Sequence, residues 1–372
     1  SILGTMFVDS LKAIAPVLVA VLVVSSVARA DGSMGKRFKT VITLYLLTTF
    51  LAAVVAVIAS ILFPVTLDLK EVEAKTDLVS LSDVFSNFFT NLVTNPFQSV
   101  ASANYMGVLF WSILVGLGVK LKASTKTIEV IKDFSEVISQ VVGWVIQFAP
   151  LGIMGLVFTS VAESGLHIFT EYGRLLLQLV GCMLFVSFVL NPLLVAFYLH
   201  RNPYPLIFKC MKESGLNAFF TRSSAANIPV NMALCKKLGL DEDFYSVSIP
   251  LGSTINMDGA AVTITVFSLA VAHTVGIEVS FMSAIFLSFI ATLGACGASG
   301  VAGGSLLLIP MACSFFGISD DAAMQAVAIG FIISVVQDSV ETALNSSGDV
   351  VFTATAEMAE RMKKAAGSTF GF

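Results

Sequence analysis

The chain has 372 residues, of which 56% are hydrophobic and only 12% charged, and its formal net charge is −4. A soluble protein of this size carries about 25% charged residues, so the composition excludes a cytosolic enzyme, a nucleic-acid-binding protein and a secreted domain. It predicts a protein solvated mainly by membrane lipid, and the lack of a long basic or acidic block predicts no nucleic-acid partner. The five cysteines form no CxxC pair and the three histidines are isolated, so we expect neither disulfides nor a metal site built from them.

Long apolar runs predict the membrane helices. Each run approaches the roughly 20 residues that a helix needs to cross a bilayer, and no alternating pattern indicates a β-barrel. In chain order the runs are Leu3–Ala28, Val41–Val65, Tyr105–Val119, Val137–Val161, Leu175–Leu199, Tyr245–Val275 and Ala322–Glu357. The third is short, and we expect it to continue upstream through Phe97–Ala103 or to be broken there. Because the first run begins almost at Ser1, we also expect upstream residues to be missing.

Two further segments are too polar or too rich in glycine to be ordinary membrane spans. Glu213–Cys235 contains TRSSAANIP at residues 221–229, and Phe281–Phe315 contains GACGASGVAGG at residues 294–304. Basic residues mark the cytoplasmic side of a membrane protein. The first segment has lysines on both sides, whereas the second is flanked by Glu278 and by Asp320–Asp321. We therefore expect two hairpins, one entering from the cytoplasm and one from outside.

The sequence thus predicts an all-α multispan membrane protein with inverted repeats. Two oppositely oriented re-entrant helical hairpins would each be followed by a helix, and broken helices would form a binding site near the middle of the membrane. The alternative is two ordinary glycine-rich helices packed through small residues. That arrangement would place one flanking basic cluster on the outer side.

The last apolar run carries a stripe of polar residues. Its members recur at steps of three or four, which places them on one face of a helix: Ser334, Asp338, Glu341, Thr342, Asn345 and Asp349. Each carboxylate is costly in lipid unless it is paired or solvated, so the stripe is expected to face a cation, a cavity or partner charges. The alternative is a helix lying flat at the membrane interface, which the wholly apolar opposite face argues against.

The run Tyr245–Val275 contains a second polar interruption, Gly252–Gly259, with Asn256 and Asp258 at its centre. Asparagine and aspartate between glycines predict an unwound helix, whose free carbonyl and side-chain oxygens suit a small hard cation. In the second run, Tyr45, Thr48 and Thr49 share one face and could complete such a site. By themselves, these hydroxyls are more often bonded to their own helix.

Charge indicates a mechanism. Asp258, Asp338, Glu341 and Asp349, with Arg222 as the one nearby cation, leave the predicted site negative if all are ionised. A zwitterionic substrate would not change that charge, but cations bound with it would neutralise the site. We therefore expect substrate and cation binding to be coupled, with protonation of a carboxylate as the alternative to one of the cations.

These motifs together resemble the dicarboxylate/amino acid:cation symporter family, which has the glutamate-transporter-homologue fold, and more closely its bacterial serine/threonine:sodium branch. They are Thr221–Ser224, Asn256–Gly259, Gly300–Gly303 and the stripe, and the resemblance runs from about Leu3 to Ala359. It implies an importer, not an enzyme, that co-transports sodium ions, uses no organic cofactor and works by elevator-type alternating access. It also implies a homotrimer, surrounded by lipid, in the bacterial cytoplasmic membrane with a cytoplasmic C-terminus.

The resemblance implies roles for individual residues. Asp338 would hold the substrate ammonium, and Asn345 with Ser223 and Ser224 would hold its carboxylate. Thr342 and the second-hairpin residues Val301 and Gly303 would complete the substrate site, and Arg222 would act as a gating or charge partner. One sodium site would use Asp349, Asn345, Asn256 and Gly252. A second would use Thr254, Met257, Ala295, Cys296 and Ala298. A third would use Tyr45, Thr48, Thr49, Asn256 and Asp258.

The departures from the family pattern concern the substrate. Where members that carry acidic substrates have an arginine, this chain has Glu341, and where they have a helper threonine it has Ala260. A glutamate repels a second carboxylate. It suits a small hydroxylated side chain such as that of serine or threonine, or else it pairs with Arg222. A sodium- or proton-coupled dicarboxylate or acidic amino acid symporter is the main alternative.

Two alternatives from other classes are weaker. Gly297–Gly300 spells the GxSG motif of an intramembrane serine protease, but His273 is the only histidine in the C-terminal half and lies on another helix. A passive channel would leave the single closed polar pocket unexplained. For domain organisation, we expect membrane helices of scaffold and transport domain at 1–66 and 67–200, and a transport core at 201–372.

Overall fold

The computed structural model describes residues 2–29, 36–69, 93–102, 104–148, 150–152, 154–155, 158, 167–296 and 303–368, and these residues form helices and connecting loops without strands. The N-terminal half contains α1 (Ile2–Arg29), α2 (Lys36–Leu62), α4 (Pro96–Ala101), α5 (Tyr105–Lys122), α6 (Thr125–Gln147), α8 (His167–Phe185), the π-helical turn η1 (Val186–Leu190) and α9 (Asn191–Leu199). The C-terminal half contains α10 (Tyr204–Cys210), the π-helical turn η2 (Met211–Gly215), α11 (Leu216–Thr221), α12 (Ser224–Lys237), α13 (Glu242–Ile255), α14 (Asp258–Thr274), α15 (Phe281–Ala295), the 3-10 turn η3 (Ser305–Leu308), α16 (Ile309–Ser314) and α17 (Asp320–Ser368).

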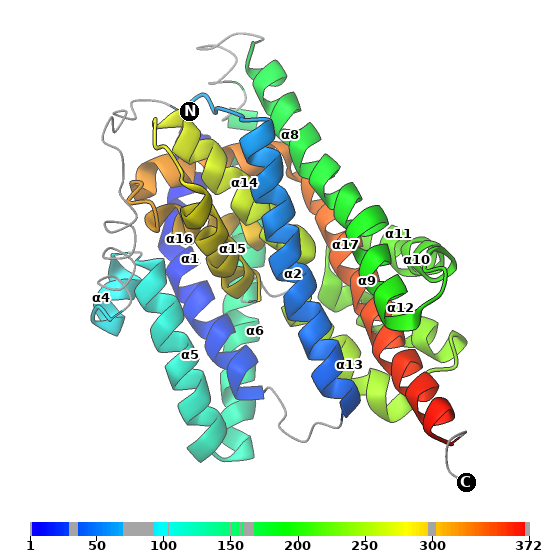
Figure 1. Cartoon of the computed structure of the whole chain (residues 1–372). Helices are drawn as coiled ribbons and strands as arrows, with labels where there is room; N and C mark the ends of the chain where they lie inside the picture. Colours follow the sequence, from blue (N-terminus) through cyan, green and yellow to red (C-terminus); the bar gives the residue numbers. More distant parts are fainter. Residues whose placement is uncertain are drawn as a thin grey trace.

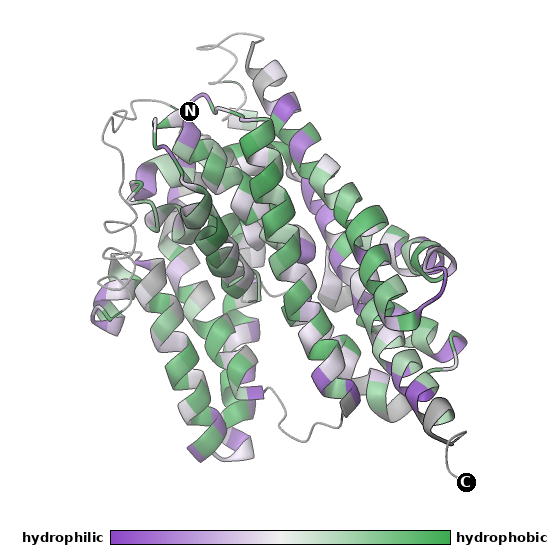
Figure 2. Ribbon diagram, in the orientation of Figure 1, coloured by the Kyte–Doolittle hydropathy of each residue, from purple (hydrophilic) through white to green (hydrophobic). Residues whose placement is uncertain are grey.

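The all-α membrane architecture is confirmed. Within the described ranges, five helical stretches are long and apolar enough to cross a membrane. They are Arg37–Leu62, Thr125–Gly152, Tyr172–Leu199, Ser248–Thr274 and Asp320–Lys363. Large hydrophobic side chains lie on the outside of four of these stretches, as expected for a surface covered by lipid, whereas Ser248–Thr274 is almost wholly enclosed by other helices. Figure 2 shows hydrophobic residues along the outward faces of α2, α5 and α8, whereas hydrophilic residues gather toward the lower ends of α2, α5 and α17.

The helix boundaries depart from the apolar runs at two places. The run predicted at Val137–Val161 is preceded by a charged amphipathic stretch, and the helix α6 already begins at Thr125. The short run at Tyr105 is broken from its upstream neighbour, because Asn104 caps α5 by accepting a hydrogen bond from the Gly107 N–H at 3.2 Å. Hydropathy locates the part of a helix that lies in lipid, but it does not detect a polar end, such as the first turns of α6, that extends beyond the membrane.

Helix packing separates the molecule into two groups of helices. The helix α1 packs against α5 and α6, whereas α2 packs against α14 and α15. The long helix α17 runs through the second group and contacts α8, α9 and α11–α14 along its length. Figure 1 shows α1, α5 and α6 side by side at the lower left and α17 descending diagonally behind α8 and α9. The polar stripe therefore belongs to the helix with the most neighbours.

Two helix–turn–helix segments pack on α17 from different sides. In the first, α11 ends where Arg222 adopts a left-handed conformation (φ 49°), and α12 begins two residues later. In the second, α15 leads to η3 and α16, and residues 297–302 between them lie outside the described residues. Figure 1 places α10–α12 at the right and α15–α16 at the upper left of α17. Their re-entry from opposite membrane faces stays a prediction.

A cluster of buried amide side chains joins the first helix–turn–helix segment, α11–α12, to α17 by hydrogen bonds. The Asn227 amide donates to the Ser346 hydroxyl at 2.7 Å and to the Ser214 hydroxyl at 3.0 Å. The Asn231 amide donates to the Ser346 carbonyl at 3.0 Å. Because polar groups buried without partners destabilise a fold by about 1–3 kcal/mol each, this cluster fixes the position of α12 against the helix that carries the stripe.

Two π-helical turns change the direction in which the following helix faces. The turn η1 joins α8 to α9 and is followed by Asn191 and Pro192. The turn η2 joins α10 to α11 and contains Ser214. Such turns are rare and occur frequently at functional sites, and here each lies at or next to a polar residue that reaches the interior.

Candidate functional site

The stripe on α17 faces the protein interior. Ser334, Asp338, Glu341, Thr342, Asn345 and Asp349 are all buried, with at most 8% of each residue exposed. An interfacial helix would expose these residues to water, and a lipid-facing stripe would leave them in hydrocarbon. The structure therefore rules out both arrangements and places the acidic residues among α2, α13, α14 and the two helix–turn–helix segments.

Asp338 lies under the second segment. Its Oδ1 accepts a hydrogen bond from the Gly303 N–H at 3.2 Å, and the Arg222 guanidinium interacts with its charge. The Thr342 hydroxyl donates instead to the Asp338 carbonyl oxygen at 2.8 Å. The predicted ammonium-binding carboxylate thus meets one residue from each helix–turn–helix segment, and Thr342 bonds to its own helix.

Glu341 lies in a cluster of hydrogen-bond donors. Its Oε2 accepts hydrogen bonds from the Thr263 hydroxyl at 2.6 Å, the Gln337 amide at 2.6 Å and the Ser305 hydroxyl at 2.9 Å. These donors belong to α14, α17 and η3, so three elements orient one carboxylate. Its Oε1 has no protein donor among the described residues, and no ion pair joins Glu341 to Arg222 in that part of the chain. One oxygen is therefore saturated and the other is left for a further partner.

Gly259 allows α14 to approach α17 at this point. A Cβ atom there would lie 2.9 Å from the Cα, Cγ and carbonyl oxygen of Glu341. The contact is with backbone as well as side chain, so a larger residue would force the two helices apart. The same Gly259 donates its N–H to Asn345 Oδ1 at 2.7 Å, which satisfies one of the free donors at the start of α14.

Asp349 has the features of a cation ligand. Its Oδ1 accepts a hydrogen bond from the Asn256 amide at 3.0 Å, while its Oδ2 is buried without a partner in the described part of the chain. A Cβ on Gly252 would lie 2.7 Å from Asp349 Oδ1 and 2.9 Å from the Tyr45 hydroxyl. Buried polar atoms almost always have partners, so an orphaned carboxylate oxygen beside this close approach fits a bound cation.

Asp258 lies beside the two threonines of α2. The Thr49 hydroxyl is 2.8 Å from the Tyr45 carbonyl and 3.1 Å from Asp258 Oδ1, although its single proton can serve only one of them. Thr48 lies 3.4 Å from Asn256 Oδ1. The side chain of Asn191, from the start of α9, donates to Asp258 Oδ2 at 3.3 Å, and its own Oδ1 is buried without a partner. These oxygens outnumber the protons available to them, as at a cation site.

The break between α13 and α14 supplies the remaining predicted residues. Asn256 and Met257 lie between the helices, the Met257 N–H donates to the Thr49 hydroxyl at 3.2 Å, and the Asn345 amide is 3.4 Å from the Met257 sulfur. The Cys296 sulfur approaches the Ile255 carbonyl at 3.6 Å, which brings the end of α15 to the break. The Thr254 hydroxyl donates to the Leu251 carbonyl of its own helix.

The three predicted sodium sets therefore form one connected region. The first and third sets share Asn256, and Tyr45, predicted for the third, has its hydroxyl 3.1 Å from the Asp349 carbonyl of the first. Ala295 is buried at the end of α15, and Ser224 is buried at the start of α12 beside Ser223. Ala298 and Val301 lie outside the described residues.

Sequence reasoning missed four residues that contact the site: Thr263, Ser305, Gln337 and Asn191. A signal existed for two of them. Gln337 precedes Glu341 by four residues, which places both on one face of α17, and Asn191 is a lone amide in an apolar run. Thr263 and Ser305 look like ordinary packing residues in sequence, because their importance depends on tertiary contacts with α17.

Comparison with known proteins places the chain in a family. The model of the sodium:dicarboxylate symporter family matches residues 1–358. The chain belongs to the sodium:dicarboxylate symporter family. It is similar to a protein of Bifidobacterium adolescentis named serine/threonine transporter SstT, with 60% identity over 95% of this chain and 83% of the relative. It is also similar to a protein of the same name from Streptococcus agalactiae serotype Ia, with 53% identity over 98% of this chain and 90% of the relative.

Membership makes this symporter a multi-pass membrane transporter and not an enzyme. The protease alternative therefore fails; its motif at Gly297–Gly300 lies outside the described residues. The family description also identifies sodium as the co-transported ion. In the described ranges, no group of three or more His, Cys, Asp or Glu residues could hold a metal ion, so the cation region consists of isolated carboxylates among neutral oxygens.

Proposed function

We propose that this symporter imports serine and threonine together with sodium. The observation that carries the proposal is the position of Glu341: three donors hold Oε2 in the polar region of α17, and Oε1 is left for a substrate hydroxyl. A buried carboxylate at that place repels a second substrate carboxylate. The names of the two relatives, serine/threonine transporter, support the same substrate class.

The ends of the substrate would bind at different residues. The substrate ammonium would pair with Asp338, whose Oδ1 already accepts a hydrogen bond from Gly303. The substrate carboxylate would bind at Asn345 and at the turn containing Ser223 and Ser224, near the left-handed Arg222. The hydroxyl would donate to Glu341. Each polar group of serine would then have a partner of opposite character.

Sodium would neutralise the remaining carboxylates. One ion would bind at Asp349 and Gly252, near Tyr45, where a carboxylate oxygen has no partner among the described residues. Another would bind at Asp258 and Thr49. Asn345 accepts a hydrogen bond from Asn256 at its carbonyl and one from Gly259 at its side chain. Binding of a cation at Asn256 would therefore directly affect Asn345, where the substrate carboxylate would bind. This connection gives a physical path for coupling.

The separation of the helices into two groups supports transport by an elevator motion. The group of α2 and α8–α17 would carry the substrate past α1, α5 and α6. The family resemblance supports a homotrimer in the bacterial cytoplasmic membrane. The lysines and arginines at the C-terminal end of α17 support a cytoplasmic C-terminus.

Uptake into proteoliposomes tests the proposal. Labelled serine, threonine, aspartate and succinate would be offered with and without an inward sodium gradient. We expect sodium-dependent uptake of serine and threonine, and its loss in Asp338→Asn. Uptake of aspartate or succinate in preference to serine would instead support a dicarboxylate symporter, and serine uptake indifferent to sodium would overturn the coupling.

A further inference from the structure

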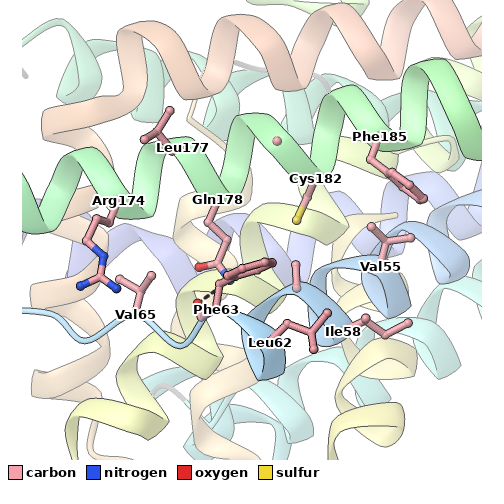
Figure 3. A pocket seen from close by; sticks show the side chains of 12 residues that line it. Val55, Ile58, Leu62, Phe63, Val65, Arg174, Leu177, Gln178, Cys182 and Phe185 are labelled. Carbon is pink, nitrogen blue, oxygen red and sulfur yellow. Dashed lines mark hydrogen bonds between the residues drawn. The ribbon is translucent and has the colours of Figure 1, made fainter.

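A groove of about 640 Å³ runs along the outer surface between α2 and α8, away from the candidate site. Figure 3 shows α8 along one wall, with Arg174 at one end and Phe185 at the other, and the end of α2 with the residues that follow it along the opposite wall. Most lining side chains are apolar, and Arg174 is the one charged residue among them. The groove thus has one charged end and one hydrocarbon end.

The walls of the groove are fixed to each other. The Gln178 amide donates to the Ser60 hydroxyl and to the Phe63 carbonyl, both at 3.3 Å. In the middle of α8, a Cβ added to Gly181 would meet no heavy atom within 4 Å, so this glycine leaves the groove open. These contacts and the missing side chain at Gly181 give the groove its shape.

The length of the groove corresponds to one leaflet of a membrane. Arg174 and Phe185 are eleven residues apart, which is about 17 Å along a helix. Half of the hydrocarbon core of a bilayer is about 15 Å thick. Arg174 lies at the beginning of the membrane-spanning stretch Tyr172–Leu199, so the charged end is at the membrane boundary and the apolar end is near the middle.

The exposed residues of the groove face lipid. Leu177 is 75% exposed and Phe63 is 68% exposed, with no other described helix over them. Arg174 is also exposed, and within the described residues it forms no ion pair or hydrogen bond. An arginine at the membrane boundary binds phosphate through parallel hydrogen bonds from its planar guanidinium. Its charge complements an anionic headgroup and gives no advantage to an uncharged amphiphile.

We propose that the α2–α8 groove binds one anionic phospholipid, whose phosphate pairs with Arg174 and whose acyl chain lies over Gly181 toward Phe185. The chemical class follows from the two ends of the groove, which suit a phosphate bearing a net negative charge at the boundary and an acyl chain about one leaflet long. The lipid would remain bound to the helices that carry the substrate.

Native mass spectrometry of the purified protein tests the site. The delipidated protein in detergent would be titrated with dioleoylphosphatidylglycerol and with dioleoylphosphatidylcholine, which differ in headgroup charge. We expect one phosphatidylglycerol to bind about fivefold more tightly than phosphatidylcholine, since one cation near an anionic lipid contributes about that factor. Arg174→Gln should abolish this preference. Gly181→Leu should weaken both lipids about tenfold, because it displaces roughly two methylene groups from the groove.

Matched variants separate the site from general lipid contact. Lys122→Gln removes an exposed cation, and Gly118→Leu adds the same side chain at a glycine in open space, both on α5. These controls should leave the bound lipid unchanged, and melting temperatures should show that all variants are folded. A preference for phosphatidylglycerol that survives Arg174→Gln, unchanged lipid retention in Gly181→Leu, or equal losses in the controls would overturn the proposal. So would added lipid that releases a second copy of the chain from the groove.

Discussion

Gly252 offers a direct test of the cation site at Asp349. A Cβ atom at this position would lie 2.7 Å from Asp349 Oδ1, 3.0 Å from its carboxyl carbon and 2.9 Å from the Tyr45 hydroxyl. Real Cβ atoms essentially never come within 3.0 Å of such neighbours, so Gly252→Ala must displace the carboxylate, the phenol or the helix. Both Asp349 and Tyr45 are fully buried, so neither can move into open space.

The size of the effect follows from packing. Adding a methyl group to a well-packed interior costs about 1–3 kcal/mol, which corresponds to a change of about 5- to 150-fold in an equilibrium constant. If the displaced carboxylate binds sodium, this cost falls on the cation-loaded state. We therefore expect Gly252→Ala to raise the sodium concentration for half-maximal serine binding by about that factor, with serine affinity at saturating sodium little changed.

The assay is binding of labelled serine to the purified protein across a range of sodium concentrations. The matched control is Gly118→Ala on α5, where an added Cβ meets no atom within 4 Å. A folded Gly252→Ala protein with the sodium dependence of the unmodified chain would refute the placement of a cation between Asp349 and Gly252. A loss of serine binding that sodium cannot restore would also contradict it.

Three further perturbations test other parts of the site. Glu341→Arg combined with Ala260→Thr should weaken serine binding at least about tenfold, because it removes a charge-assisted hydrogen bond, and it should allow aspartate to bind. Competition binding with serine and aspartate measures both effects. Unchanged selectivity between the two amino acids would remove Glu341 from the substrate pocket. Asn191→Leu removes the unpartnered Oδ1 that lies beside Asp258 and should raise the half-maximal sodium concentration, whereas a shift in serine affinity alone would point to another role. Asn227→Leu leaves the buried Ser346 and Ser214 without their donor and should destabilise the fold by about 1–3 kcal/mol, seen as a lower melting temperature. Asn217→Leu removes only the donor to Asn227 Oδ1 from an exposed position and should cost less, and an equal effect of the two variants would argue against a special role for the contacts with Ser346 and Ser214.

The sequence was sufficient to predict where polar residues in the membrane-spanning helices lie, because such residues are costly in lipid. A carboxylate in an apolar run must have a partner, so Asp338 and Asp349 identified an inward-facing stripe without any structure, and Gly252 and Asn256 located the broken helix. Both predictions are confirmed in geometry: the stripe is buried, and α13 ends at Ile255. The roles of these residues in binding stay predictions.

The partners of the stripe could not be predicted, because they depend on distances between helices far apart in sequence. Ser305 reaches Glu341 only because η3 and α16 fold back onto α17, and no periodicity specifies that contact. The pairing of Tyr45 with Asp349 also depends on the packing of α2 against α13 and α17. Sequence pattern indicates which face of a helix is inward, but not which inward faces meet.

The π-helical turn η1 has a consequence for how the membrane span can change. A π turn accommodates one more residue than an α-helical turn, and each residue rotates a helix by about 100°. The extra residue in Val186–Leu190 therefore determines which way the side chains of α9, including Asn191, point around the helix axis. Deleting a single residue there would restore regular α-helical hydrogen bonding and leave the span hydrophobic and nearly full length. It would also rotate the Asn191 amide out of the interior. Shortening the span by one residue would therefore remove the contact between Asn191 and Asp258, although the mean hydropathy of the span would hardly change.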